Sequence, residues 1–275
     1  MPATSVFPYW VTNMNVDYLA SSIIIFALTL YLSKYLRATK STFIIPSSAD
    51  LAVSISLLSI LLLSKVSTLF ILIMSVILSA ILVKVGQTSH APLLIKVIGY
   101  STALLIIPYI SYEMYSYVTS LVTGFLYLTP ETVSLLIVDA ILLLIYLIFD
   151  IQIAYSFFDK EFSEIIGLKP SLWVSLVLFG AVIVGFTMTF MYGFLIAHIL
   201  ALSATNIKNR KLGIISFTVF TSLLIMNIPA ALAVALGSVL ATVIDKMLLL
   251  WKGSNLKVSK VRKAVVRKAL GVPGV

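Results

Sequence analysis

LAVSISLLSILLLSKVSTLFILIMSVILSA, Leu51 to Ala80, is the stretch that decides the fold. It belongs to two apolar runs, residues 43–63 and 67–83, which are separated by little more than Ser64, Lys65 and Val66. A helix of about 20 apolar residues is long enough to cross the hydrocarbon core of a bilayer. The stretch therefore predicts two transmembrane helices joined by a tight antiparallel turn.

The whole chain shares the composition of this stretch. Of its 275 residues, 61% are hydrophobic and only 11% are charged, and its mean hydropathy is +1.14. A soluble domain of this length needs far more charge to cover its surface. We therefore expect an all-α polytopic integral membrane protein, with a membrane domain over residues 1–251 and a cytoplasmic tail over residues 252–275. The chain contains no cysteine, which excludes disulfides and cysteine nucleophiles.

About seven apolar runs are predicted to cross the membrane. The first is expected to be retained, because its basic residues follow it rather than precede it as in a signal peptide. The last two exceed a core of roughly 30 Å, so they must tilt, protrude or break. Asn227 and Pro229 favour a break in the last run, and Pro108 favours a kink in the fourth. The runs cover residues 18–36, 43–63, 67–83, 97–117, 132–149, 172–200 and 213–250.

Positive charge orients the chain. With seven crossings and the N-terminus outside, 15 of the 19 Lys and Arg residues lie on the cytoplasmic side and 4 lie outside. This bias predicts an N-out, C-in topology in the cell membrane. The loop around Lys208, Arg210 and Lys211 is the exception. It would turn inward if both long runs were helical hairpins, an alternative ranked second because a 29-residue hairpin is cramped.

Asp139 lies near the middle of the fifth apolar run. An ionisable residue at that depth is costly and normally faces the bundle interior, a partner or water. Asp150 follows almost three turns later and Tyr146 lies close to the same helix face. A proton or cation path along this face is one interpretation, and a packed carboxyl group bonded to a neighbouring hydroxyl is the more conservative one.

Other polar residues have conservative interpretations beside functional ones. Glu113, ringed by tyrosines in PYISYEMYSY, is either a gate near an outer vestibule or part of an aromatic belt at headgroup depth. Asn227 and Pro229 can form a binding site at a break in the last run. His90 and His198 are expected to be interface histidines, because neither has zinc-ligand spacing.

Small and hydroxylated residues are predicted to serve helix packing. Ala181 and Gly185 form one smooth stripe at helical spacing, and Ala233, Gly237 and Ala241 form another. The serines of residues 51–67 are expected to bond within their own helices or pack, with a pore lining as the alternative. The loop FDKEFSEIIGLKP is expected to be a solvated amphipathic linker or a docking surface for a cytoplasmic protein.

Motifs of common membrane enzymes are absent from the sequence. It has no Gly-rich phosphate loop, GxSxG, HExxH or paired Asp-rich motif. We therefore expect no enzymatic activity, no cofactor and no metal site, and favour a channel, transporter or assembly subunit.

The C-terminal segment KVSKVRKAVVRKAL is basic and amphipathic. Its valines occupy one helix face and its charges the neighbouring faces, which is typical of an interfacial helix that meets anionic lipid. Contact with DNA phosphates or with a partner ATPase is the alternative. The basic residues are Lys257, Lys260, Arg262, Lys263, Arg267 and Lys268.

The layout resembles the polytopic subunit of the archaeal DNA-import (Ced) system, a distant analogue of type IV secretion channel subunits. The similarity rests on Ile-, Leu-, Ser- and Thr-rich spans such as DLAVSISLLSILLLSKVSTLFILIMSVILSA, short loops, the lack of cysteine and the basic ending. It implies a passive membrane channel or platform for DNA uptake. Its partners would be small two-helix membrane subunits and a separate cytoplasmic ATPase.

A secondary transporter or ion channel for a small solute is the alternative function. It would use Asp139 and the break at Asn227 and Pro229 as its binding site, because broken helices at mid-depth are typical of that class.

Overall fold

The computed structural model describes residues 11–38, 41, 43–85, 91–109, 111, 115, 119, 121, 129–206, 243, 244 and 247. No strand occurs among these residues, so the predicted all-helical fold is confirmed for them. The elements are α1 (Val11–Ala38), α2 (Ile44–Leu63), α3 (Thr68–Val85), α4 (Ala91–Ile106), the 3₁₀ turn η1 (Ile107–Tyr109), α6 (Pro130–Ile148), α7 (Asp150–Phe158), α8 (Lys160–Ile165), α9 (Pro170–Tyr192) and α10 (Phe194–Asn206).

Three helices are long and apolar enough to cross a membrane. They are α2, α6 and α9, with 20, 19 and 23 residues, while the apolar helices α3 and α4 are shorter. The chain is therefore a helical membrane protein. The expected count of seven is not reached in the part of the chain that the structure describes, partly because the last run lies almost wholly outside it. In addition, the α-helical part of the fourth run ends at Ile106. A 3₁₀ turn that contains Pro108 follows it.

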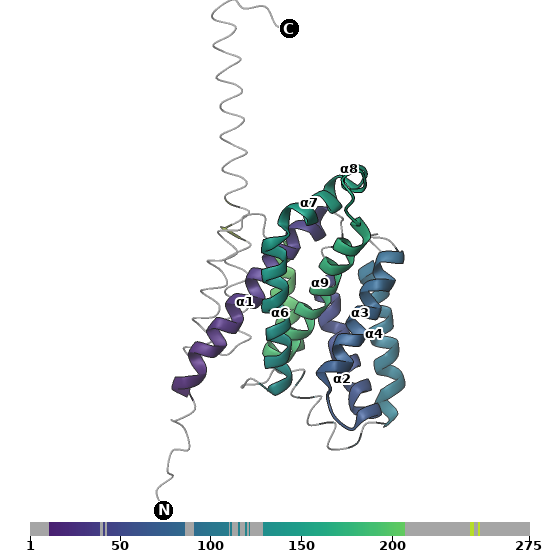
Figure 1. Ribbon diagram of the computed structural model, residues 1–275. Coiled ribbons are helices and arrows are strands. Elements are labelled where there is room, and N and C mark those ends of the chain that lie inside the picture. The colour runs from purple at the N-terminus through teal and green to yellow at the C-terminus, as the bar shows by residue number, and fades with distance from the viewer. Residues whose placement is uncertain are drawn as a thin grey trace, which may run out of the picture.

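Helix α9 is the centre of the bundle (Figure 1), and α1, α2, α3, α6, α7 and α10 all pack against it. It has no charged residue, and a helix that is apolar all round is normally buried. A Cβ atom at Gly185 would lie 2.7 Å from the Ile45 carbonyl oxygen and 2.8 Å from the Ser48 Cβ atom. The absence of a side chain therefore lets α2 approach, as the Ala181 and Gly185 stripe predicted.

The serines of α2 are buried and used in packing, as expected. Ser48 and Ser56 donate to carbonyl oxygens of their own helix, each at 2.7 Å. Ser54 donates to the Gly99 carbonyl oxygen of α4 at 2.7 Å. This bond holds two helices together where no water competes for it. The alternative of a pore lined by these serines is not supported.

The turn between α2 and α3 is as short as predicted. Ser64 ends α2 in the left-handed conformation, with φ 57°. Ser59 donates to the Lys65 carbonyl oxygen at 3.0 Å and accepts from the Ser67 amide at 2.9 Å. The Ser59 hydroxyl thus closes the turn, after which α3 packs more on α9 than on α2.

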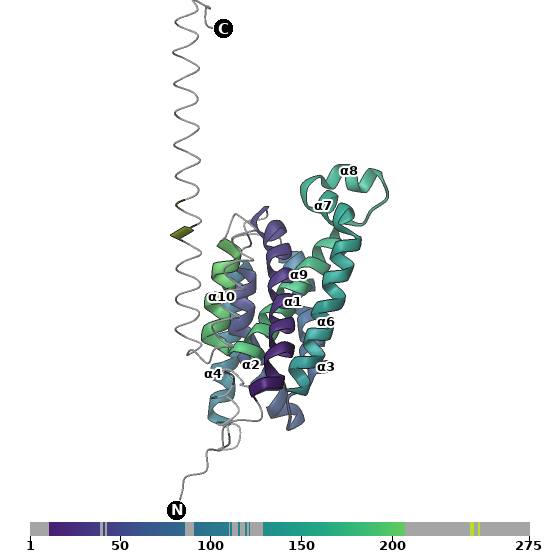
Figure 2. The same ribbon diagram turned by 90° about the vertical axis from the view of Figure 1, so that its left-hand side faces the viewer.

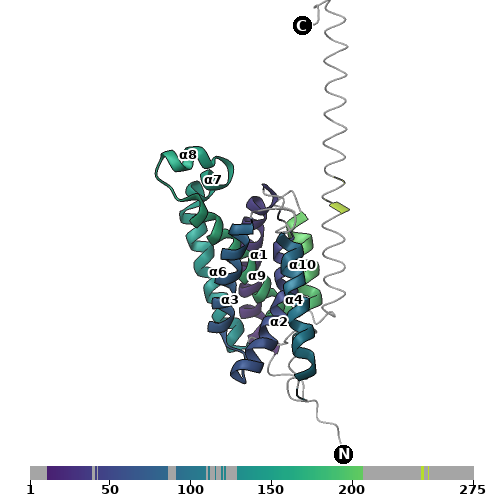
Figure 3. The ribbon, with the colours of Figure 1, turned by 90° about the vertical axis from the view of Figure 1, so that its right-hand side faces the viewer.

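The long sixth run breaks at Gly193, whose φ of 81° and ψ of 158° belong to a region that essentially only glycine adopts. Thr189 and His198 both reach α2, at the adjacent residues Ala49 and Asp50. In a straight helix these two residues would be separated by about 13.5 Å along the axis. Helix α10 therefore folds back beside α2 and α9 (Figures 2 and 3). The preferred expectation of a single span over residues 172–200 is wrong.

Helices α7 and α8 project from one end of the bundle (Figure 1). The FDKEFSEIIGLKP segment, which the sequence predicts to be a linker or a docking surface, begins at the last residue of α7 and contains α8. Asp159 caps α8 by accepting from the Phe162 amide at 3.0 Å. Phe158, Phe162 and Ile165 are exposed. The segment therefore contains one short ordered helix, α8, with exposed apolar side chains.

Candidate functional site

Asp50 is the centre of a charged cluster inside the bundle. It is the seventh residue of α2, and its side chain is only 1% exposed. One carboxyl oxygen lies 3.3 Å from the Lys96 Nζ atom of α4, and the other lies 3.2 Å from the His198 Nδ1 atom of α10. We call Asp50, Lys96 and His198 the Asp50 cluster.

The position of the Asp50 cluster in the fold is unusual. It joins a membrane-spanning helix, α2, to the short helix that follows the break at Gly193. A buried charge is costly unless it is paired, and an irregular backbone inside a membrane protein normally lies within protein or lines a wet cavity. The exposed fractions of the Lys96 and His198 side chains are 35% and 25%, so both bases can be reached from outside the cluster.

Sequence reasoning missed Asp50 and gave His198 only an interface role. The signal for Asp50 was available, because a lone carboxylate inside an apolar run is what singled out Asp139. The partners were not predictable. The predicted runs 67–83 and 97–117 leave Lys96 in the loop between them, and the backward course of α10 brings His198 to α2.

Asp139 is fully buried between α6 and α9. The hydroxyl of Thr187 in α9 faces it but donates to the Ile183 carbonyl oxygen at 3.1 Å. Within the described residues, neither carboxyl oxygen of Asp139 has a hydrogen-bond partner. The prediction that this side chain faces the bundle interior is confirmed.

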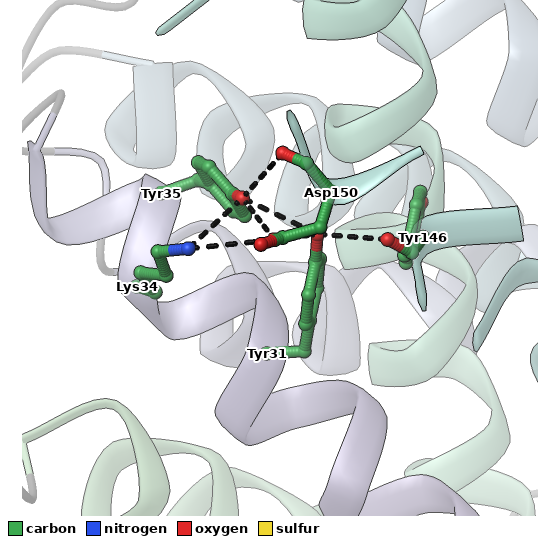
Figure 4. A network of polar contacts seen from close by, with 5 residues as sticks. All are labelled: Tyr31, Lys34, Tyr35, Tyr146 and Asp150. Atoms are coloured by element: carbon green, nitrogen blue, oxygen red, sulfur yellow. Dashed lines mark hydrogen bonds and ion pairs between the residues drawn. The ribbon is translucent and has the colours of Figure 1, made fainter. Parts of the chain in front are cut away.

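Asp150 lies at the start of α7, in contact with the end of α1 (Figure 4). Its Oδ1 atom accepts from the hydroxyls of Tyr31 at 2.5 Å and Tyr35 at 2.6 Å. The Lys34 Nζ atom lies 3.4 Å from the same oxygen. We call Tyr31, Lys34, Tyr35 and Asp150 the Asp150 cluster, and it fastens α7 to α1.

The Asp150 cluster changes the acidity of its carboxyl group. Partial burial by itself raises the pKa of Asp150, but hydrogen bonds from Tyr31 and Tyr35 and the charge of Lys34 outweigh that effect. The net result is a pKa of Asp150 below its ordinary value, so the group is a carboxylate at neutral pH.

Tyr146 lies between the two acidic residues of this face, as the sequence predicted. Its ring stacks on Tyr31 with a centroid distance of 5.5 Å. Its hydroxyl donates to the Leu176 carbonyl oxygen at 2.6 Å. Because that hydroxyl is bonded to α9, the side chains form no continuous hydrogen-bonded path from Asp150 to Asp139 in the described part of the bundle.

The remaining predicted site residues lie outside the described residues. They are His90, Glu113, Asn227, Pro229 and the basic tail residues Lys257, Lys260, Arg262, Lys263, Arg267 and Lys268. Their roles stay predictions. Among the residues that the structure does describe, no group of three His, Asp or Glu side chains is arranged to hold a metal ion.

The fold and its interior define a helical membrane protein with ionisable side chains buried in the bundle. No protein-family model matches the chain, and no curated protein matches its sequence. Its fold is similar to that of a chain in the structure of PsaBC from Streptococcus pneumoniae in complex with Fab. The TM-score is 0.64 at 12% sequence identity, covering 86% of this chain and 91% of that one. At this identity the likeness concerns the fold alone.

Proposed function

We propose that this chain is a non-enzymatic membrane transport subunit for a small charged solute, and that the solute binds at the Asp50 cluster. One observation carries the proposal: a buried carboxylate with two basic partners lies beside a helix broken at Gly193. Discontinuous helices that place charged groups inside the membrane are typical of transporter binding sites.

The chemistry of the cluster suits a charged solute of either sign. An anionic group can replace Asp50 as the partner of Lys96 and His198. A cation can replace Lys96 as the partner of Asp50. A cation exchanges one ion pair for another, since the displaced Lys96 is partly exposed. An anion requires Asp50 to be neutralised by a proton, because an unpaired buried carboxylate is costly.

We further propose that the protein crosses the cell membrane several times, with its N-terminus outside and its tail in the cytoplasm. The distribution of Lys and Arg supports this orientation. The backward course of α10 supports the alternative for the sixth run, a helical hairpin, because α10 runs back beside α9 towards the cytoplasm in this orientation (Figure 2).

The projecting helices α7 and α8 are the proposed docking surface for a partner. They lie on the cytoplasmic side in this orientation, and Phe158, Phe162 and Ile165 offer an exposed apolar surface. A cytoplasmic ATPase is the proposed partner, because the sequence has no phosphate-binding loop of its own. Small membrane subunits would complete the assembly.

A second proposed function is DNA uptake, as the resemblance to the Ced subunit implies. The basic tail favours it, since six Lys or Arg residues without an acidic one can neutralise phosphates. DNA would then be nonspecific cargo and the chain its channel or platform.

Flux through proteoliposomes tests the first proposal. The probes are inorganic phosphate, glutamate, lysine and Mg²⁺, each applied as a gradient. We expect the wild type to pass at least one probe, and Asp50→Asn to lose that flux while its thermal unfolding stays cooperative. Asp150→Asn is the matched control, because it removes a carboxylate outside the apolar spans. Equal flux through wild type and Asp50→Asn would contradict the proposal.

Charge neutralisation in the tail tests the second proposal in cells. Lys257, Lys260, Lys263, Arg267 and Lys268 are replaced together by Gln in the full chain. If the tail serves DNA, uptake collapses while membrane insertion is intact. If the tail only binds anionic lipid, uptake persists and the tail is released more readily by salt.

A further inference from the structure

We propose that Asp139 binds a proton in the seam between α6 and α9 and releases it when the seam opens, which couples transport to proton movement. This inference rests on the proposed transport function. It concerns a carboxyl group that the Asp50 cluster does not use, on a different pair of helices.

Among the described residues of the helices packed against α6, no side chain is placed as a counter-charge for Asp139. Helix α6 packs against α1, α3, α7 and α9. Helix α9 has no acidic or basic residue, and the only such residues of α7 are Asp150 and, at its end, the acidic cap Asp159. Lys34 of α1 binds Asp150, and Arg37 donates to Ser33. Lys84 lies in the last turn of α3, and Glu131 lies in the first turn of α6 itself.

The hydroxyl groups near Asp139 already donate their hydrogen bonds to other acceptors. The Thr187 hydroxyl donates to the Ile183 carbonyl oxygen, and the Tyr146 hydroxyl donates to the Leu176 carbonyl oxygen. At the far end of α9, the Tyr192 hydroxyl donates to the Ser22 hydroxyl at 2.6 Å. A carboxylate at Asp139 would therefore have no donor from these groups, and an isolated buried carboxylate is very costly.

A protonated Asp139 fits the same surroundings. Its O–H can donate to the Thr187 oxygen, which still has a free lone pair, while the Thr187 hydrogen remains on the Ile183 carbonyl. The acid, the hydroxyl and the carbonyl then form one directional chain of hydrogen bonds. The proton is thus the ligand that completes this site.

Release of the proton requires only water. When α6 and α9 separate, water can reach the carboxyl group, the O–H bond breaks heterolytically, and the proton passes to a water molecule. The carboxylate left behind is then solvated. Closure of the seam removes that water and requires the carboxyl group to take up a proton again, so opening and closing of the seam carry one proton.

Infrared spectroscopy of the full chain in lipid tests proton occupancy. We expect a C=O stretching band of a buried carboxylic acid that is lost in Asp139→Asn and kept in Asp50→Asn and Asp150→Asn. Thr187→Val should shift this band, because it removes the hydrogen-bond acceptor. Thr189→Val is the matched control, since Thr189 is an equally buried hydroxyl that bonds to the α2 and α9 backbone. A spectrum in which Asp139→Asn removes no such band would overturn the proposal.

Proton movement tests the coupling. Proteoliposomes that contain a trapped pH-sensitive dye receive gradients of inorganic phosphate, glutamate, lysine or Mg²⁺. We expect a solute-driven pH change in the wild type that is lost in Asp139→Asn and kept in Asp150→Asn. Absence of this change in the wild type would mean that Asp139 holds its proton permanently, and its persistence in Asp139→Asn would mean that another group carries the proton. Either result would overturn the coupling. The infrared band of Asp50→Asn distinguishes solute binding at the Asp50 cluster from proton binding at Asp139. This variant should lose solute flux but still show the carboxylic acid band of Asp139.

Discussion

At the residue scale, the stability of buried Asp50 depends on its two basic partners. The pair with Lys96 can be tested by mutation. Lys96→Met leaves a buried carboxylate with only His198 beside it. Removing one partner of a buried ion pair typically costs about 3–5 kcal/mol, and we expect less here because Lys96 is partly exposed. Thermal unfolding in lipid should show a lower midpoint.

The double variant Asp50→Leu with Lys96→Met is the control for this pair. It removes both charges, so it should recover part of the stability lost in Lys96→Met. A loss of stability in the double variant equal to the sum of the losses in Asp50→Leu and Lys96→Met would show that Asp50 and Lys96 do not interact.

Gly193 carries the break between α9 and α10. An alanine there must adopt a φ of 81° and a ψ of 158°, which costs of order 1–3 kcal/mol. We expect Gly193→Ala to lower the unfolding midpoint and to weaken binding at the Asp50 cluster. Gly99→Ala is the control, because Gly99 is helical and a Cβ atom there would come no closer than 3.4 Å to its neighbours. Equal stability of the two variants would argue against a strained break.

Asp150 makes the contact between α1 and α7 dependent on pH. Its pKa is held below the ordinary value of about 3.9. A carboxyl group with a depressed folded-state pKa stabilises the fold fully above its unfolded-state pKa, and this contribution is lost as pH falls through the folded-state value. The protection of the α7 amides against hydrogen exchange, relative to their intrinsic rate, should therefore fall below about pH 4 in the wild type. In Asp150→Asn this protection should be lower at neutral pH and change less on acidification.

At the scale of elements, the approach of α2 to α9 depends on Gly185. A Cβ atom there would lie 2.7 Å from a backbone oxygen, which cannot move as a flexible side chain can. Overpacking of this kind typically costs about 1–3 kcal/mol, so Gly185→Ala should lower the unfolding midpoint. A midpoint equal to that of Gly99→Ala would show that the two helices can separate slightly without loss.

At the scale of the whole molecule, cysteine labelling tests the proposed topology, because the chain has no cysteine of its own. Single cysteines replace Ser5, Asn209 or Ser254. We expect labelling from outside intact cells at position 5 and protection at position 254. Position 209 should also be protected, because α10 turns back from Gly193. Labelling at position 209 would favour seven simple crossings, and labelling at position 254 would reverse the orientation.

The sequence by itself determined the class of the protein and the character of its helices. Hydropathy and length depend only on composition along the chain, so the apolar helices, the short turn after Leu63 and the packing role of Ser56 were predictable. The burial of Asp139 followed from the cost of a charge at membrane depth.

Only the tertiary structure decided which charges meet. Asp50, Lys96 and His198 are far apart in the chain, and hydropathy contains no information about contacts between helices. Gly193 shows the same limit: glycine is common in membrane helices, and the break appears only when Thr189 and His198 are seen to contact neighbouring residues of α2. A pairing between distant segments depends on the course of the backbone, so Asp50 gained its partners only through the fold.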